Sequence, residues 1–136
     1  MGIGPSSDSK RGIMRVIVCG SREWSDREAI ADRLFDLPPG STIVHGNAKG
    51  ADRIAAQEGQ KLGHLIEAHP ADWERHGKSA GPIRNEHMAS LGADLCLAFW
   101  DGRSRGTADM VDRAERHGIA LDLCVDGRPP GGEVPR

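Results

Sequence analysis

Short runs of apolar residues alternate along the chain with longer segments in which apolar side chains recur every three or four positions. The first run, from Val16 to Cys19, is continuously apolar and stops at Gly20. A continuous run of this kind is typical of a strand that is covered on both faces. We expect five strands, at 16–19, 42–45, 65–68, 95–99 and 119–125.

The segments between these runs have the spacing of amphipathic helices. In the first of them, Ile30 and Leu34 fall on one helical face. Ser25 and Glu28 form a capping-box pattern, which predicts that this helix begins at Ser25. Thr107 is the expected N-cap of the last helix. Helices are predicted at 25–37, 50–62, 81–91 and 107–117.

Strands that alternate with helices in this way imply right-handed crossovers between parallel neighbours. The predicted fold is α/β: a Rossmann-like, doubly wound, mainly parallel five-stranded sheet with helices on both faces. We expect this domain to span residues 14–125, with a flexible arm at 1–13 and a disordered tail at 126–136. Ligands of such sheets bind beyond the carboxyl ends of the strands, where the strand order reverses. The turns that follow the strands are therefore the expected sites of chemistry.

Charge and composition narrow the classes of function. The 136 residues give room for one domain. Lys and Arg number 18 against 20 Asp and Glu, and the net charge of -2 weighs against nucleic acid or an anionic membrane as the partner. No apolar run approaches the roughly 18 residues of a membrane span, so we expect a cytoplasmic protein without membrane contact.

Metal, cofactor and disulfide chemistry are not indicated. The 6 histidines have no metal-ligand spacing, so we expect no metal site and no cofactor. Cys19, Cys96 and Cys124 each fall in a predicted strand. A free cysteine there usually behaves as a small buried hydrophobe.

Two glycine-containing turns follow the first two strands. Gly20, Ser21 and Arg22 bring a hydroxyl and a guanidinium to the expected crevice, although a solvated turn is the alternative. The second turn runs straight into a helix, whose free N–H groups and small neighbours suit a phosphate. Asp52, in the first turn of that helix, either complements the helix dipole or contacts a ligand. The predicted phosphate cradle consists of Gly46, Asn47, Ala48, Lys49, Gly50 and Asp52.

Polar turns also follow the third and fourth strands. A long connection after the third strand leads to a helix with Arg84 and Asn85 in its first turn. An Arg near a helix N-terminus opposes the dipole, which favours a functional role for Arg84, whereas a local hydrogen bond explains Asn85 equally well. The turn after the fourth strand offers backbone N–H groups and hydroxyls to a phosphate. Its candidate residues are Gly102, Ser104, Gly106 and Thr107.

Aromatic side chains gather near the same edge. Trp24, Trp73 and Trp100 all lie at or beyond the carboxyl end of a predicted strand, while the chain has no Tyr and 2 Phe. Each ring is a candidate face for a stacked base, and each is equally able to pack beneath its own loop.

Taken together, five of these turns resemble the YspA-related branch of the SLOG superfamily, which is related to the LOG, or lysine-decarboxylase-like, proteins. The resemblance covers about residues 14–121 and implies a Rossmann-like fold that holds nucleotide-derived ligands in its glycine turns. Many members of this branch occur in phages and bacterial conflict systems, and we expect such a role here. The matching segments are Gly-Ser-Arg at 20–22, Gly-Asn-Ala-Lys-Gly-Ala-Asp at 46–52, Pro-Ala-Asp-Trp at 70–73, Gly-Pro-Ile-Arg-Asn through Met at 81–88, and the turn at 99–107.

The resemblance extends in part to the LOG active site. LOG enzymes release a base from a nucleoside 5′-monophosphate with a Pro-Gly-Gly-x-Gly-Thr turn, a following Glu and an Arg from the preceding helix. Gly106 and Thr107 match the end of that turn, and Arg84 corresponds to the Arg. The turn here is one residue longer and begins with Asp101 in place of Pro.

The expected Glu is absent. Met110 stands at its position, and Asp109 lies one position away, about 100° around the helix. Cleavage of a glycosidic bond forms an oxocarbenium-like centre that needs a nearby carboxylate. Asp101 or Asp72 would supply it by another route, so the candidate catalytic residues are Arg84 and Asp101.

Three hypotheses follow. The first is a module that binds a nucleotide or nucleotide-derived ligand, as a sensor or a sequestering protein. The second is a nucleoside 5′-monophosphate phosphoribohydrolase or related N-glycosidase, and the third is binding of single-stranded nucleic acid, against which the net charge of -2 counts. The resemblance also implies a homodimer.

Overall fold

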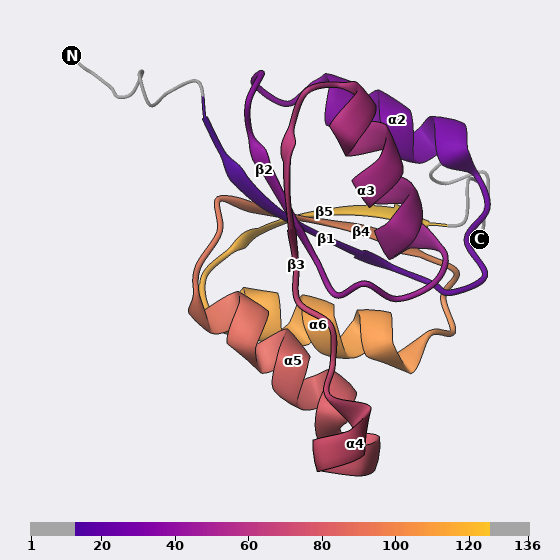
Figure 1. The fold of residues 1–136 in the computed structure, drawn as a ribbon, viewed down its shortest axis with the longest axis vertical. Coiled ribbons are helices and arrows are strands. Elements are labelled where there is room, and N and C mark those ends of the chain that lie inside the picture. The colour runs from indigo at the N-terminus through magenta and orange to yellow at the C-terminus, as the bar shows by residue number, and fades with distance from the viewer. Residues whose placement is uncertain (1–12, 126–136) are drawn as a thin grey trace.

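The computed structural model describes residues 13–125, so the predicted tail and all but the last residue of the predicted arm lie outside the described residues. The chain alternates strands and helices as its hydrophobic pattern predicts (Figure 1). The strands are β1 (Arg15–Gly20), β2 (Thr42–His45), β3 (Leu65–Ala68), β4 (Leu95–Trp100) and β5 (Ala120–Val125). The helices are α2 (Arg27–Phe35), α3 (Ala51–Lys61), α4 (Trp73–His76), the 3-10 turn η1 (Gly77–Ser79), α5 (Ala80–Ser90) and α6 (Arg105–Arg116).

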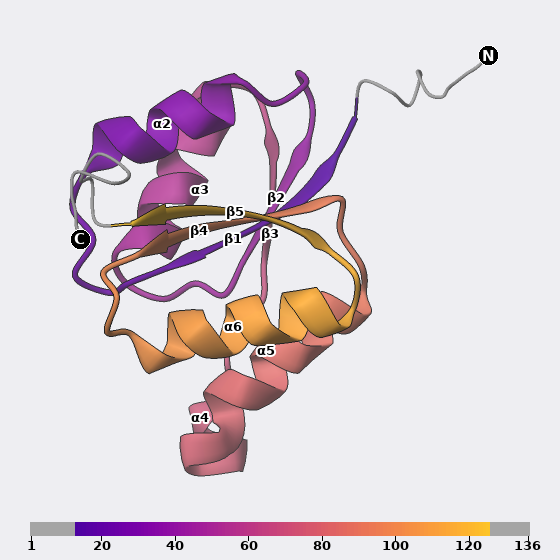
Figure 2. The same ribbon diagram turned by 180° about the vertical axis from the view of Figure 1, so that it is seen from behind.

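All neighbouring strands pair in parallel, in the order β3-β2-β1-β4-β5. Helices α2 and α3 cover one face of the sheet, and α5 and α6 cover the other (Figures 1 and 2). The predicted Rossmann-like, doubly wound fold is confirmed. The chain runs outward from β1 to β3 and then returns to β4 on the other side of β1, so the strand order reverses between β1 and β4. A ligand crevice is expected at the carboxyl ends of these strands.

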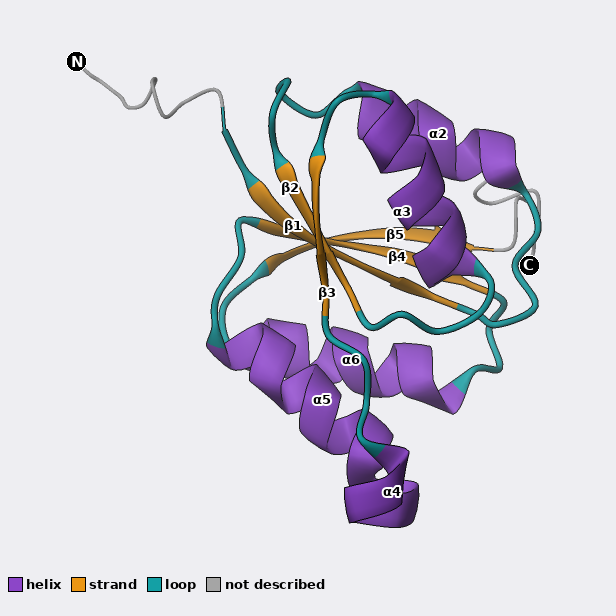
Figure 3. Ribbon diagram, in the orientation of Figure 1, coloured by secondary structure: helices purple, strands orange, loops and turns teal. Residues whose placement is uncertain are grey.

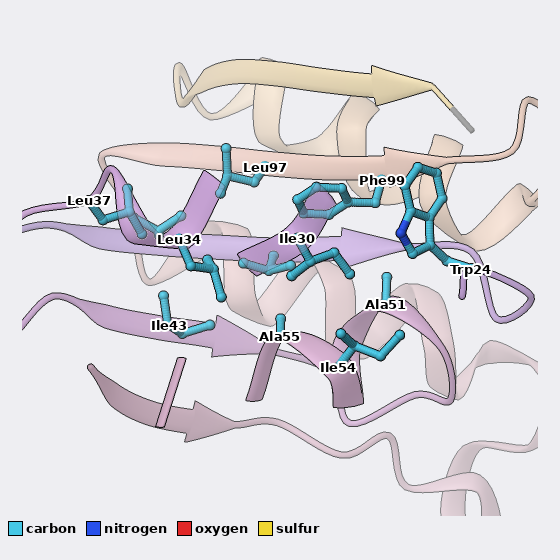
Figure 4. Close-up of a cluster of buried hydrophobic side chains, with 12 residues drawn as sticks. Trp24, Ile30, Leu34, Leu37, Ile43, Ala51, Ile54, Ala55, Leu97 and Phe99 are labelled. Carbon is cyan, nitrogen blue, oxygen red and sulfur yellow. The ribbon is translucent and has the colours of Figure 1, made fainter. Parts of the chain in front are cut away.

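The hydrophobic core has one cluster on each face of the sheet. On the α2 and α3 face, Ile30, Leu34 and Ala55 pack in one cluster with Ile43 and Leu97 (Figure 4). On the other face the buried side chains include Met88, Met110 and Ala114. The central strands β1 and β4 are buried along most of their length, whereas the edge strands β3 and β5 are partly exposed. The apolar runs of the central strands thus reflect burial on both faces.

The three cysteines do not share one environment. Cys19 and Cys96 are buried on adjacent central strands, with their sulfur atoms 3.9 Å apart. Cys124 lies on the edge strand β5 and is only partly buried. The expectation of a small buried residue holds for the central pair, Cys19 and Cys96.

Two helix caps differ from the prediction. Asp26, not Ser25, caps α2, because its carboxylate accepts a hydrogen bond from the Ala29 N–H at 3.1 Å. Ser104, not Thr107, caps α6 in the same way, and the Thr107 hydroxyl is buried against it. In both cases a competing polar residue stands close enough in sequence to form the cap instead.

The connection between β3 and α5 is more ordered than the sequence suggests. It contains α4 and η1, and it projects from the body of the domain (Figure 3). No helix within residues 13–125 is long and apolar enough to cross a membrane.

Candidate functional site

A cavity of about 820 Å³ opens at the carboxyl edge of the sheet. The turns after β1, β2 and β4 line it, together with the starts of α4 and α5. Of the residues that the sequence singled out, those lining the cavity are Gly20, Arg22, Gly46, Asn47, Ala48, Lys49, Asp52, Trp73, Arg84, Asn85, Ser104, Gly106 and Thr107. Those outside its lining are Ser21, Trp24, Gly50, Trp100, Asp101 and Gly102.

Ser21 forms hydrogen bonds to the neighbouring turns. Its side chain is fully buried, and its hydroxyl accepts a hydrogen bond from the Asp101 N–H at 2.9 Å. Its carbonyl accepts from the Ala51 N–H at 3.2 Å, and its own N–H donates to the Phe99 carbonyl. Ser21 therefore ties the turns after β1, β2 and β4 together, and the prediction that it contacts a ligand is replaced by this supporting role.

Asp101 shapes its own turn. Its carboxylate accepts hydrogen bonds from the N–H groups of Arg103 and Ser104 at 2.8 and 2.9 Å, and these bonds lower the pKa of the carboxyl. Because the side chain is committed to the turn and does not line the cavity, we remove Asp101 from the candidate catalytic residues.

The three tryptophans have different roles. Trp24 is buried and packs against Phe99 with ring centroids 5.6 Å apart (Figure 4). Trp100 donates its indole N–H to the Ser104 carbonyl at 3.0 Å. Only Trp73 lines the cavity, with 59% of its surface exposed. The prediction of a stacking face is therefore kept for Trp73 and withdrawn for the other two rings.

Arg84 is fixed at the centre of the site by backbone and amide oxygens. Its Nε donates to Asn85 Oδ1 at 2.8 Å, and its Nη1 donates to the carbonyls of Gly46 and His69. Burial lowers the pKa of the guanidinium, and the charges of Asp52 and Asp109 partly oppose this effect. Within residues 13–125, Arg84 forms no ion pair with a carboxylate, and its Nη2 donates no hydrogen bond. A partly desolvated cation that is not directly paired with a carboxylate is suited to an anionic ligand.

Asn85 connects α5 to α6. Its Nδ2 donates to Asp109 Oδ2 at 3.0 Å and to the Gly106 carbonyl at 3.4 Å. Asp109 also accepts from Arg113 Nε at 2.9 Å. The local hydrogen bond offered as the alternative for Asn85 is therefore present, while its side chain also lines the cavity.

Sequence reasoning did not place Asp109 in the site. Met110, at the position of the LOG Glu, is 1% exposed and belongs to the core, while Asp109 lines the cavity. The spacing of apolar residues in α6 could have revealed this. Thr107, Met110 and Ala114 are three or four positions apart and face the core, so Asp109 lies beside that buried face. Other lining residues that the sequence did not single out include Cys19, Arg53 and Arg105.

The N-terminus of α6 has free donors. Ser104 Oγ accepts from the Thr107 N–H, but the N–H groups of Arg105 and Gly106 have no acceptor among residues 13–125. No atom lies within 4 Å of the position that a Gly106 side chain would occupy. This turn therefore combines free N–H groups, open space and the positive end of a helix dipole.

The turn before α3 differs from the predicted cradle. Asp52 Oδ2 accepts hydrogen bonds from the N–H groups of Gly46 and Ala48 at 2.8 and 3.3 Å. Asp52 is 5% exposed, and its burial raises the pKa of the carboxyl to about 6, although the two backbone bonds partly oppose the rise. Two of the backbone donors that the sequence suggested for phosphate, the N–H groups of Gly46 and Ala48, are thus already occupied by the protein's own carboxylate.

The fold and this edge cavity define a Rossmann-like α/β domain with a polar crevice at its topological switch point. The sequence model of the YspA, cpYpsA-related SLOG family matches residues 14–76, and the chain belongs to this family. The match includes the turns after β1 and β2, whereas Arg84 and the turn before α6 lie beyond it.

A relative and a solved structure are also similar to this chain. The Gene 61 protein of Mycobacterium phage D29 is 47% identical over 118 residues, which cover 79% of this chain and 93% of that protein. The C-terminal domain of a hydrogenase from Pyrococcus furiosus aligns with a TM-score of 0.49 and 14% identity, over 82% of this chain and 90% of that one. The family thus has a phage member, as the resemblance led us to expect.

Proposed function

We propose that the edge cavity binds a nucleotide or nucleotide-derived ligand. The observation that carries this proposal is that the free N–H groups of α6 and Arg84, which is not directly paired with a carboxylate in residues 13–125, line one cavity of about 820 Å³. Sites for small molecules commonly measure about 300–1,000 Å³ and combine a few directed polar groups with apolar walls. Membership in the SLOG family agrees with a ligand of this class.

The phosphate is assigned to the turn before α6. The N–H groups of Arg105 and Gly106 supply donors there, and Arg84 supplies a planar cation. Arg22 and Lys49 also line the cavity and add positive charge around it. Trp73, exposed at the rim, supplies a flat face for a base.

Replacement of Arg84 by alanine tests the phosphate assignment. We expect Arg84→Ala to weaken binding of AMP or ADP-ribose by about tenfold to a hundredfold, because a charge-assisted hydrogen bond to phosphate contributes about 1.5–3 kcal/mol. Arg84→Lys should recover only part of this loss, because an ammonium lacks the guanidinium fork. Isothermal titration calorimetry measures both changes.

The matched control is Arg116→Ala. Arg116 lies at the other end of α6, is exposed, and pairs with Asp112. We expect this variant to bind as the unmodified protein does. Unchanged affinity in Arg84→Ala for every nucleotide that binds would remove Arg84 from the site.

Gly46→Ala tests the same guanidinium indirectly. A Cβ at Gly46 would lie 2.3 Å from Arg84 Nη1, so the guanidinium must move. Because it is the end of a flexible side chain, we expect a small change in stability, below about 1 kcal/mol, and nucleotide binding weaker by about tenfold. Thermal unfolding and calorimetry on one sample separate the two effects. A large loss of stability without a change in affinity would contradict this placement of Arg84.

A second candidate function is hydrolysis of a nucleoside 5′-monophosphate. Asp52 and Asp109 line the same cavity as Arg84, and both carboxylates act electrostatically on its guanidinium. Either one would serve in place of the missing Glu to stabilise an oxocarbenium-like centre. Release of free base and ribose 5-phosphate from AMP would favour this function over binding alone.

A further inference from the structure

The Asp52 carboxylate uses its two oxygen atoms differently. Oδ2 accepts both backbone hydrogen bonds of the turn, from Gly46 and Ala48. Oδ1 accepts no hydrogen bond from any residue in 13–125 and forms no ion pair there. The side chain is nine-tenths buried and lines the cavity. One oxygen of a buried carboxylate is therefore left without a protein donor on the wall of the ligand cavity.

Asp52 Oδ1 is open to the cavity, because it is not among the buried side-chain atoms that lack a hydrogen-bond partner in residues 13–125. A ligand that covers this oxygen must offer it a donor, since a charged acceptor that is buried without a partner is unfavourable. A phosphate is not that partner, since two anions at hydrogen-bonding distance repel each other. The N–H groups to which the phosphate is assigned lie elsewhere, at the start of α6. The ligand group opposite Asp52 is therefore a hydrogen-bond donor.

The occupied Oδ2 narrows the choice of donor. A carboxylate that reads guanine or a guanidinium uses both oxygens side by side. With Oδ2 committed to the turn, Oδ1 is suited to a single donor, and a ribose hydroxyl is a single donor that every ribonucleotide carries. The α3 turn follows β2 and the α6 turn follows β4, on either side of β1, so the two strand ends lie about 10 Å apart. A ribose 5′-phosphate is long enough to reach across this distance, with its phosphate at the α6 turn and its hydroxyls near Asp52.

We propose that Asp52 Oδ1 accepts a hydrogen bond from a ribose hydroxyl, so that the site selects ribonucleotides over nucleotides that lack the 2′- and 3′-hydroxyls. This inference rests on the proposed binding of nucleotides and adds the sugar to it. Asp52 is then the residue that determines sugar specificity, while the α6 turn and Arg84 hold the phosphate.

The test compares AMP, GMP, CMP and UMP with their 2′,3′-dideoxy forms by calorimetry at pH 7.5. Each mononucleotide that binds is expected to bind about tenfold more tightly in its ribose form. Asp52→Asn keeps an oxygen for the two backbone bonds but presents an N–H₂ donor to the cavity. We expect this variant to weaken the ribose form about tenfold and to leave the dideoxy form nearly unchanged, so that the preference disappears.

The control is Asp112→Asn, at an exposed position of α6 outside the cavity lining. It should preserve both the affinity and the sugar preference. Equal binding of ribose and dideoxy forms by the unmodified protein would overturn the role of Asp52 and leave the proposed function intact. An equal loss for both forms in Asp52→Asn would overturn that role as well. Absence of binding by every mononucleotide would overturn the role of Asp52 stated here, and absence of binding by ADP-ribose and NAD as well would overturn the proposed function itself.

Discussion

Gly50→Ala is expected to destabilise the domain by more than about 3 kcal/mol, which is a large share of the stability of a small domain. Gly50 precedes α3 with φ at 76°, a conformation that side chains rarely adopt. A Cβ there would also lie 2.4 Å from the Ser21 carbonyl oxygen and 2.5 Å from that of Arg22. Because these are backbone atoms, they cannot move without separating the turns after β1 and β2. Urea unfolding followed by circular dichroism measures the loss.

Gly63→Ala is the matched control. Its φ of 86° is similar, but no atom lies within 4 Å of the position of its Cβ. Only the conformational cost remains, about 1–2 kcal/mol. Equal losses in the two variants would mean that the close approach of the two turns contributes nothing to stability.

Asp52→Asn is expected to raise the free energy of unfolding at pH 7.5 by about 3 kcal/mol. Burial raises the pKa of Asp52 to about 6 in the folded state, above its ordinary value of 3.8. The folded protein therefore holds the proton more tightly, and stability is lost as the pH rises from about 4 through 6. Asparagine is neutral throughout, so the difference should vanish near pH 4.

Asp101→Asn should behave in the opposite way. Hydrogen bonds from the N–H groups of Arg103 and Ser104 lower the pKa of Asp101, so its ionised form stabilises the folded state at neutral pH. The substitution should reduce the free energy of unfolding at pH 7.5. It should have no effect at a pH so low that Asp101 is protonated in both the folded and the unfolded state. Chemical denaturation between about pH 4 and pH 7.5 measures the free energy of unfolding of both variants. A less stable Asp52→Asn at pH 7.5 would mean that the carboxylate's bonds to the turn outweigh its desolvation.

The fold follows closely from the hydrophobic pattern. Continuous apolar runs identified the strands because β1 and β4 are covered on both faces, and the intervening helices required parallel crossovers. The starts of the helices were less accurate, since Ser25 and Asp26 are adjacent capping residues and the sequence does not decide between them.

The position of the site was predictable, but the direction of each side chain was not. Parallel strands bring their following turns to one edge, which predicted where Arg84, Asp52 and Gly106 meet. Whether a turn residue faces the cavity depends on hydrogen bonds between turns distant in sequence. The Ser21 hydroxyl accepts such a bond from the Asp101 N–H, whereas the Asp101 carboxylate is occupied by the N–H groups of its own turn.

Asp52 illustrates the same difficulty within one turn. Its place at the start of α3 suggested either a dipole complement or a ligand contact. In the structure the carboxylate folds back onto the Gly46 and Ala48 N–H groups and also reaches the cavity. This double role depends on tertiary burial, which a local sequence pattern does not specify.

The central claim is that the edge cavity binds a nucleotide or nucleotide-derived ligand. The most direct measurement is ligand-observed NMR with AMP, ADP-ribose, cyclic ADP-ribose and NAD, each followed for hours with the protein present. We expect saturation transfer to at least one of them, and its loss in Arg84→Ala. Signals of free base and ribose phosphate would add hydrolysis to binding. No saturation transfer to any of the four, or equal transfer in Arg84→Ala, would contradict the assignment of this cavity.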